Sequence, residues 1–170
     1  MANQGVAAVK VEVLAHQLEV SRGSFYWHFK NRPELLEEIL KRWETETLWL
    51  IEESQKETTP EARLIKMFAL AEELFDLPDP EAAIFIWANQ ESRVQERVRI
   101  VETRRVNYLN QLLQDYGFDE IEARQKAEIG YFAFMGFWER RERDKKFDLS
   151  IKDFGKLLID LLLSPVRERK

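Results

Sequence analysis

Residues 20–32 read Val-Ser-Arg-Gly-Ser-Phe-Tyr-Trp-His-Phe-Lys-Asn-Arg, and this stretch decides how the chain is organised. Ser21 is a suitable N-cap for a short helix that we expect to run to about Phe29. The apolar positions of residues 9–18 indicate another short helix just before it. Two short helices joined by a tight turn form a helix-turn-helix, and the second helix of such a motif can enter the major groove of DNA.

The same stretch concentrates positive charge in a chain that is acidic overall. The formal net charge of −5 is not typical of a nonspecific nucleic-acid binder, so DNA binding would need a local basic surface. Residues 20–32 contain no acid, and their basic residues are Arg22, His28, Lys30 and Arg32. Hydroxyl groups suited to phosphate oxygens belong to Ser21, Ser24 and Tyr26. Without the helix-turn-helix pattern, such a cluster would more often be a solvated surface.

Helical patterns fill the remainder of the chain. Asn31 can cap a helix that has Pro33 in its first turn and runs to about residue 56. Further helices are expected over residues 58–76, 81–88, 91–116, 119–143 and 150–163, with a break at residues 77–80. Because the chain has only 6 Gly and 5 Pro, helix is favoured over a sheet with many tight turns. We therefore predict an all-α fold of two short helices followed by six that form a bundle.

The order of residues 20–32 is very similar to the recognition helix, and the start of the next helix, of the tetracycline-repressor (TetR) family. The resemblance covers roughly residues 5–40, and the later residues match in helix order and length. It implies a helix-turn-helix DNA-binding module at residues 1–32 and a helical ligand-binding and dimerisation domain at residues 33–170. It also implies a transcriptional regulator, a repressor that a small-molecule effector releases from double-stranded operator DNA.

By the same resemblance, Arg22, Gly23 and Ser24 lie where the family reads bases. Arg22 could donate to O6 and N7 of guanine, and Gly23 would let the backbone approach the DNA closely. The residues that would hold phosphates are Ser21, Tyr26, His28, Lys30 and Arg32. Phe25 and Phe29 should face inward, and Trp27 is expected to pack against the protein rather than to stack on a base.

Two features depart from the family pattern. The family has a helix of several turns before the position of Gly5, and only four residues precede Gly5 here, so we expect that first helix to be absent. The turn between the short helices usually carries glycine where this chain has Glu19. If the backbone there needs a positive φ, another residue costs on the order of 1 kcal/mol. The alternative function is therefore a helical dimeric module for ligand binding or interaction, which has lost DNA binding through N-terminal truncation.

The last two predicted helices point to a second copy of the chain. Residues 129–138 are apolar on all sides, so they must be buried on more than one side. A homodimer is the simplest way to cover the second side. The predicted interface residues are Phe132, Met135, Phe154, Leu158 and Leu161. The alternative is that the apolar residues of both helices belong to the core of a single chain.

Aromatic residues are frequent in the middle helices, where the family binds its effectors. Apolar walls with a few polar groups suit a ligand pocket. The predicted lining residues are Phe68, Trp87, Tyr108, Tyr131, Phe134 and Trp138. The alternative is that these aromatic side chains are plain core.

Nothing in the sequence indicates catalysis, a metal or a cofactor. The chain has no cysteine, two histidines near its start, no Glu-x-x-His pair and no glycine-rich phosphate loop. The longest uncharged apolar run, residues 129–138, is too short to span a bilayer, and the first residues do not resemble a signal peptide. We therefore expect a cytoplasmic, non-enzymatic protein without a membrane partner.

Overall fold

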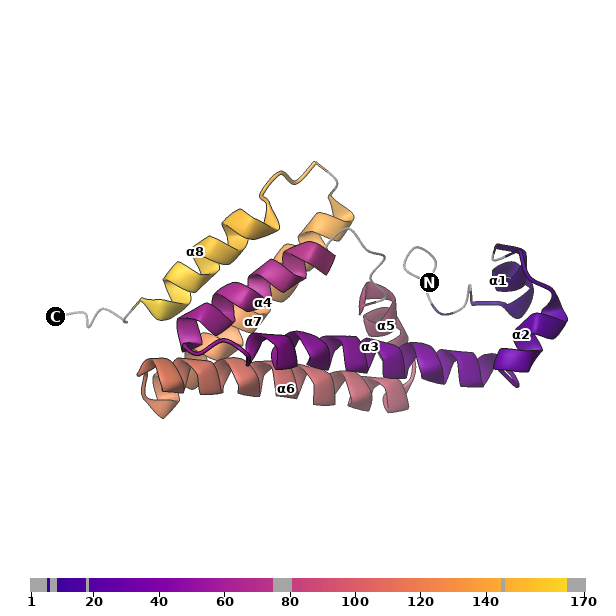
Figure 1. The fold of residues 1–170 in the computed structure, drawn as a ribbon, viewed down its shortest axis with the longest axis horizontal. Helices are drawn as coiled ribbons and strands as arrows, with labels where there is room; N and C mark the ends of the chain where they lie inside the picture. Colours follow the sequence, from indigo (N-terminus) through magenta and orange to yellow (C-terminus); the bar gives the residue numbers. More distant parts are fainter. Residues whose placement is uncertain (1–5, 7–8, 18, 75–80, 145, 165–170) are drawn as a thin grey trace. The chain divides into compact units, whose positions relative to one another are not determined.

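The structure, a computed structural model, describes residues 6, 9–17, 19–74, 81–144 and 146–164. All regular secondary structure within those residues is helical (Figure 1), which confirms the predicted all-α fold. The helices are α1 (Val11–Gln17), α2 (Arg22–His28), α3 (Arg32–Ser54), α4 (Pro60–Leu74), α5 (Glu81–Ala88), α6 (Ser92–Tyr116), α7 (Glu120–Arg143) and α8 (Ile151–Leu163). The predicted break at residues 77–80 lies outside the described residues. None of the described helices is long and apolar enough to cross a lipid bilayer.

Short polar side chains fix where several of the helices begin. The Ser21 Oγ accepts the backbone N–H of Ser24 at 3.0 Å at the start of α2, as the sequence predicted. The Asn31 Oδ1 accepts the N–H of Glu34 at 2.9 Å at the start of α3. Asp119 and Ser150 cap α7 and α8 in the same way. Each cap satisfies an N–H group that has no partner within its own helix.

The packing divides the chain into two compact units. Unit 1 contains the described residues of Met1–Thr47 and Pro78–Val101, and unit 2 contains those of Leu48–Leu77 and Glu102–Lys170. In unit 1, Leu40 of α3, Ile84 of α5 and Val94 of α6 are fully buried in one cluster. The same cluster includes Phe25 of α2, and Leu14 of α1 packs against it, so the two short N-terminal helices share a hydrophobic core with α3, α5 and α6.

Unit 2 is organised around the contact of α4 with α8, which lie side by side (Figure 1). A glycine at the crossing makes this close approach possible: a Cβ atom on Gly155 would lie 2.8 Å from the Phe68 ring. Lys126 of α7 ties the end of α8 in place. Its ammonium donates to the carbonyl oxygens of Leu162 at 3.0 Å and Ser164 at 2.6 Å, where the helix leaves acceptors without partners.

Candidate nucleic-acid interface

Burial of one side fixes the orientation of α2. Phe25 is 7% exposed and lies in the core of unit 1, and Phe29, which follows the helix, is half-buried against the same core. The two rings are in contact, with centroids 5.3 Å apart. This confirms that Phe25 and Phe29 face inward, and it leaves the opposite side of a seven-residue helix facing solvent.

The solvent side of α2 carries the residues predicted to contact DNA. Gly23, Ser24, Tyr26 and His28 are all exposed. The side chain of Arg22 lies outside what the structure describes, although its backbone begins the helix. Trp27 is 81% exposed, so the prediction that it packs against the protein is wrong. A helix of seven residues can bury only one side, and Phe25 occupies it.

Three residues at the edges of α2 complete the predicted surface. The exposed Ser21 uses its Oγ as an acceptor for the helix cap, so its O–H remains available as a donor. The Lys30 ammonium is exposed, and the backbone N–H of the same residue donates to Glu34 Oε2 at 2.5 Å. Arg32 differs from both, because it is half-buried. Its guanidinium donates from Nε to the Val9 carbonyl and from Nη2 to the Val6 carbonyl, each at 2.7 Å.

The turn between α1 and α2 contains a residue with a positive φ, at the position that the sequence analysis singled out. Glu19 has a φ of +54°, within the left-handed region. Its N–H donates to His16 at 3.2 Å, and the N–H of Val20 donates to Ala15 at 2.9 Å. These two bonds form a Schellman motif, which places a left-handed residue just after a helix. Glu19 therefore has the positive φ at which a residue other than glycine costs conformational free energy.

Salt bridges that the sequence analysis missed join α3 to α6 within unit 1. The Arg97 guanidinium donates to both carboxylate oxygens of Glu44, at 2.6 and 2.5 Å, and to Glu37. Arg93 donates to Glu37 at 2.5 Å and to Glu91 at 3.1 Å. The two acids of α3 are seven residues apart and the two arginines of α6 are four apart, so each pair lies on one face of its helix. This spacing was the feature of the sequence that could have indicated the salt bridges.

Two carboxylates of this network, those of Glu37 and Glu91, have lowered pKa values. Burial raises the pKa of Glu37, but the hydrogen bonds from Arg93 and Arg97 outweigh it and bring the pKa below its ordinary value. The pKa of Glu91 is also lowered, first by the hydrogen bond from the Trp87 indole N–H at 2.8 Å and then by the one from Arg93. Glu37 and Glu91 are therefore charged at neutral pH, where they contribute to the stability of the network.

The predicted dimer residues divide into exposed and buried sets. Phe132 of α7 and Leu161 of α8 are 65% and 62% exposed, as interface residues of an isolated chain should be. Met135 and Phe154 are half-buried in unit 2. Leu158 is 5% exposed and belongs to the core of the chain, so a partner could contact little of it. On α8, the neighbouring Leu157 is exposed instead. On α7, Ile129 and Gly136 are also exposed.

The predicted pocket residues lie in different units. Trp87 is buried in the core of unit 1. The others lie in apolar clusters of unit 2: Phe68, Tyr108, Tyr131, Phe134 and Trp138. Phe134 contacts the rings of both Phe68 and Trp138, with centroids about 6 Å apart. The Tyr108 hydroxyl is hydrogen-bonded to the buried Ser54 Oγ at 2.6 Å.

A short helix-turn-helix with a polar, solvent-facing second helix, followed by a larger set of helices, is an architecture of transcriptional regulators. Residues 1–39 match the family described as bacterial regulatory proteins, tetR family. No curated protein sequence matches the chain.

Solved structures provide the comparison over the whole chain. The fold is similar to that of a TetR-family transcriptional regulator from Rhodococcus sp., with 19% identity, coverage of 96% of this chain and 92% of that one, and a TM-score of 0.63. It is similar to a TerR/AcrR-family regulator from Aquifex aeolicus, with 23% identity, coverage of 95% and 90%, and a TM-score of 0.62. It is also similar to FadR from Bacillus subtilis in complex with stearoyl-CoA, with 19% identity, coverage of 98% and 93%, and a TM-score of 0.61. At these identities the likeness shows the fold, and the match to the tetR family model covers residues 1–39.

Proposed function

We propose that the chain is a repressor that binds double-stranded operator DNA as a homodimer, with α2 in the major groove. The observation that carries the proposal is the division of α2 into a buried and an exposed side. Phe25 anchors the helix in the core of unit 1, while the exposed side presents hydroxyl, imidazole and indole groups. A recognition helix needs such support from behind, because its exposed side must keep a fixed orientation in the groove.

The residues around α2 take distinct roles in this proposal. Gly23 and Ser24 lie in the first turn, the part of a recognition helix that contacts base edges. Arg22 in the same turn reads a guanine through O6 and N7. Phosphate contacts come from Ser21, Tyr26, His28 and Lys30, which position the helix without reading sequence. The exposed Trp27 adds an apolar surface that fits a thymine methyl group or a sugar.

The dimer is proposed to form through α7 and α8. Both helices leave large apolar side chains exposed in the single chain, including Phe132, Leu157 and Leu161. Leu161→Lys should therefore yield a monomer that keeps its fold. Leu158→Ala is the matched variant, because it removes a buried side chain and should cost stability, about 2–5 kcal/mol, without exposing a charge in the interface. Light scattering that shows a monomeric unmutated chain at micromolar concentration would contradict the dimer.

An effector is proposed to bind among the aromatic residues of unit 2. Phe68, Phe134 and Trp138 form a continuous set of ring contacts, and Tyr108 supplies a hydroxyl. The similarity in fold to FadR, whose structure contains stearoyl-CoA, supports an apolar effector. Two helices, α3 and α6, contribute residues to both units, so a change in unit 2 has a covalent path to the core that holds α2. The functional division into residues 1–32 and 33–170 is part of this proposal.

The DNA-binding proposal can be tested without knowing the operator. Random double-stranded DNA is selected on the dimer, and the enriched sequence is titrated by fluorescence anisotropy at several salt concentrations. Lys30→Ala should weaken binding and lower the slope of log affinity against log salt by about 0.9, the value for one lost phosphate contact. Lys41→Ala is the control, because Lys41 is equally exposed but lies outside the interface on α3. Failure to enrich any sequence would favour a dimeric ligand-binding module instead.

A further inference from the structure

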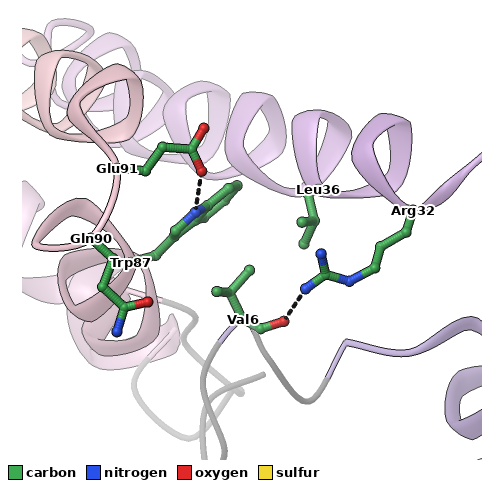
Figure 2. A pocket seen from close by; sticks show the side chains of 6 residues that line it. All are labelled: Val6, Arg32, Leu36, Trp87, Gln90 and Glu91. Carbon is green, nitrogen blue, oxygen red and sulfur yellow. Dashed lines mark hydrogen bonds between the residues drawn. The ribbon is translucent and has the colours of Figure 1, made fainter.

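A groove in unit 1 includes Arg32, which the sequence predicted to hold a phosphate, and none of the residues of the effector pocket proposed for unit 2. It encloses about 290 Å³ and is lined by Val6, Arg32, Leu36, Trp87, Gln90 and Glu91 (Figure 2). This volume is close to the lower end of the range for small-molecule sites. Leu36 and Trp87 are almost completely buried and form an apolar floor, while Gln90 is exposed at the mouth.

The positive charge at the wall of the groove belongs to Arg32, and one edge of its guanidinium is already hydrogen-bonded. A guanidinium has five N–H groups in a rigid fork with two edges that can each hold a pair of oxygens. The edge formed by Nε and Nη2 holds the carbonyl oxygens of Val9 and Val6, each at 2.7 Å. The outer edge, formed by Nη1 and the second N–H of Nη2, has no partner among the described residues. Figure 2 shows the guanidinium at the groove, beside Val6 and Leu36.

Among the residues that the structure describes, Arg32 has no counter-ion. The half-buried cation meets only neutral carbonyl groups, and no carboxylate of a described residue pairs with it. Glu91 lines the groove, but both of its carboxylate oxygens are engaged, Oε2 by the Trp87 indole N–H and Oε1 by Arg93. A partly buried cation with an open donor edge favours an oxyanion, since hydrogen bonds between charged groups are the strong ones.

We propose that this groove binds a small carboxylate with an aromatic or aliphatic body, the carboxylate on the outer edge of Arg32 and the body on Leu36 and Trp87. The carboxylate oxygens match the spacing of the outer edge and supply the missing negative charge. The indole of Trp87 and the Leu36 side chain provide the apolar contact that a hydrated inorganic anion could not use. Of the pocket residues predicted from the sequence, this site contains Trp87 and none of those in unit 2. Its ligand contacts Arg32, which begins α3 directly after the helix-turn-helix.

The test titrates the full chain with benzoate, benzamide and inorganic phosphate by calorimetry. Benzoate should bind saturably, and benzamide, which has the same shape without the charge, should bind at least about tenfold more weakly. Arg32→Gln should weaken benzoate about ten- to a hundredfold, and Arg32→Lys should fall between, because lysine keeps the charge but not the fork. Phosphate binding as tight as that of benzoate would show a simple anion site, which would overturn the proposal.

A second pair of variants does not depend on Arg32 and protects the test against a folding defect. Gln90→Trp should fill the mouth of the groove and abolish benzoate binding, whereas Asn89→Trp adds the same side chain at an exposed neighbour that does not line it. Equal benzoate affinity in both variants, or no saturation by about 10 mM benzoate in the unmutated chain, would contradict the proposal. No DNA is present, so the outcome is independent of the proposed repressor function.

Discussion

Replacing Glu19 by glycine should stabilise the protein. Two Schellman motifs within the described part of the chain provide the comparison. After α6, the N–H of Gly117 donates to Gln114 at 3.0 Å and that of Phe118 donates to Leu113 at 3.1 Å, and Gly117 has a φ of +122°. The turn after α1 has the same pair of bonds, but a glutamate occupies the left-handed position. An L-residue with a Cβ atom is strained there, and glycine is not.

The size of the effect is the difference of two terms. The left-handed conformation costs about 1–2 kcal/mol for a residue with a Cβ atom. Glycine regains that energy, but it makes the unfolded chain more flexible, which offsets about 0.5–1 kcal/mol. The exposed Glu19 side chain has no hydrogen bond or ion pair with another described residue to lose, so Glu19→Gly should gain about 0.5–1 kcal/mol. For a chain of this length that corresponds to an increase in Tm of about 1–4 °C.

The measurement is urea unfolding followed by far-ultraviolet circular dichroism, with Glu19→Ala as the control for charge and side chain. Glu19→Ala should leave the midpoint nearly unchanged, because alanine keeps the Cβ atom. Gly117→Ala should lower the midpoint, since it creates at Gly117 the strain that Glu19 already has. If Glu19→Gly were no more stable than Glu19→Ala, the left-handed strain assigned to this turn would be refuted.

Three further substitutions, one of them with a matched control, test the packing and the charges. Gly155→Ala should destabilise the chain by about 1–3 kcal/mol in urea titrations, because its new Cβ would clash with Phe68, while Gly136→Ala, with nothing within 4 Å, should not. Arg97→Lys should cost about 1 kcal/mol, since lysine cannot donate to both oxygens of a carboxylate. The folded chain lowers the pKa of Glu91, so the stability from this group is present at neutral pH and lost as the pH falls below about 4.5. Glu91→Gln should therefore lose less stability on acidification than the unmutated chain. An equal loss would exclude Glu91 as a source of the pH dependence of stability.

The sequence predicted local features well, because they depend on neighbouring residues. Ser21 and Asn31 cap the helices that they were expected to cap, and Gly117 ends α6. The inward orientation of Phe25 also followed from the helix-turn-helix pattern. Each of these features involves contacts within a few residues or within one short motif.

Features that depend on distant contacts were not predictable in the same way. The last helix is apolar around much of its circumference, so its sequence does not reveal which leucines face the chain's own core. Leu158, which was predicted for the dimer interface, is buried in that core. Arg32 lies among cations in the sequence, yet its partners are carbonyl groups 23 and 26 residues earlier. Trp27 lies two residues after the buried Phe25, but a seven-residue helix has no second side to bury it.

The most direct test of DNA recognition by α2 is a double-mutant cycle between Arg22 and the base pair that it reads. The selected operator, and a version with one G·C pair replaced, are each titrated with the unmutated dimer and with Arg22→Ala. The proposal predicts that Arg22→Ala weakens binding to the operator by about 1–3 kcal/mol and has no further effect at one particular replaced base pair. If Arg22→Ala caused the same loss on the operator and on every replaced version, Arg22 would contact only the backbone, and sequence reading by this residue would be contradicted.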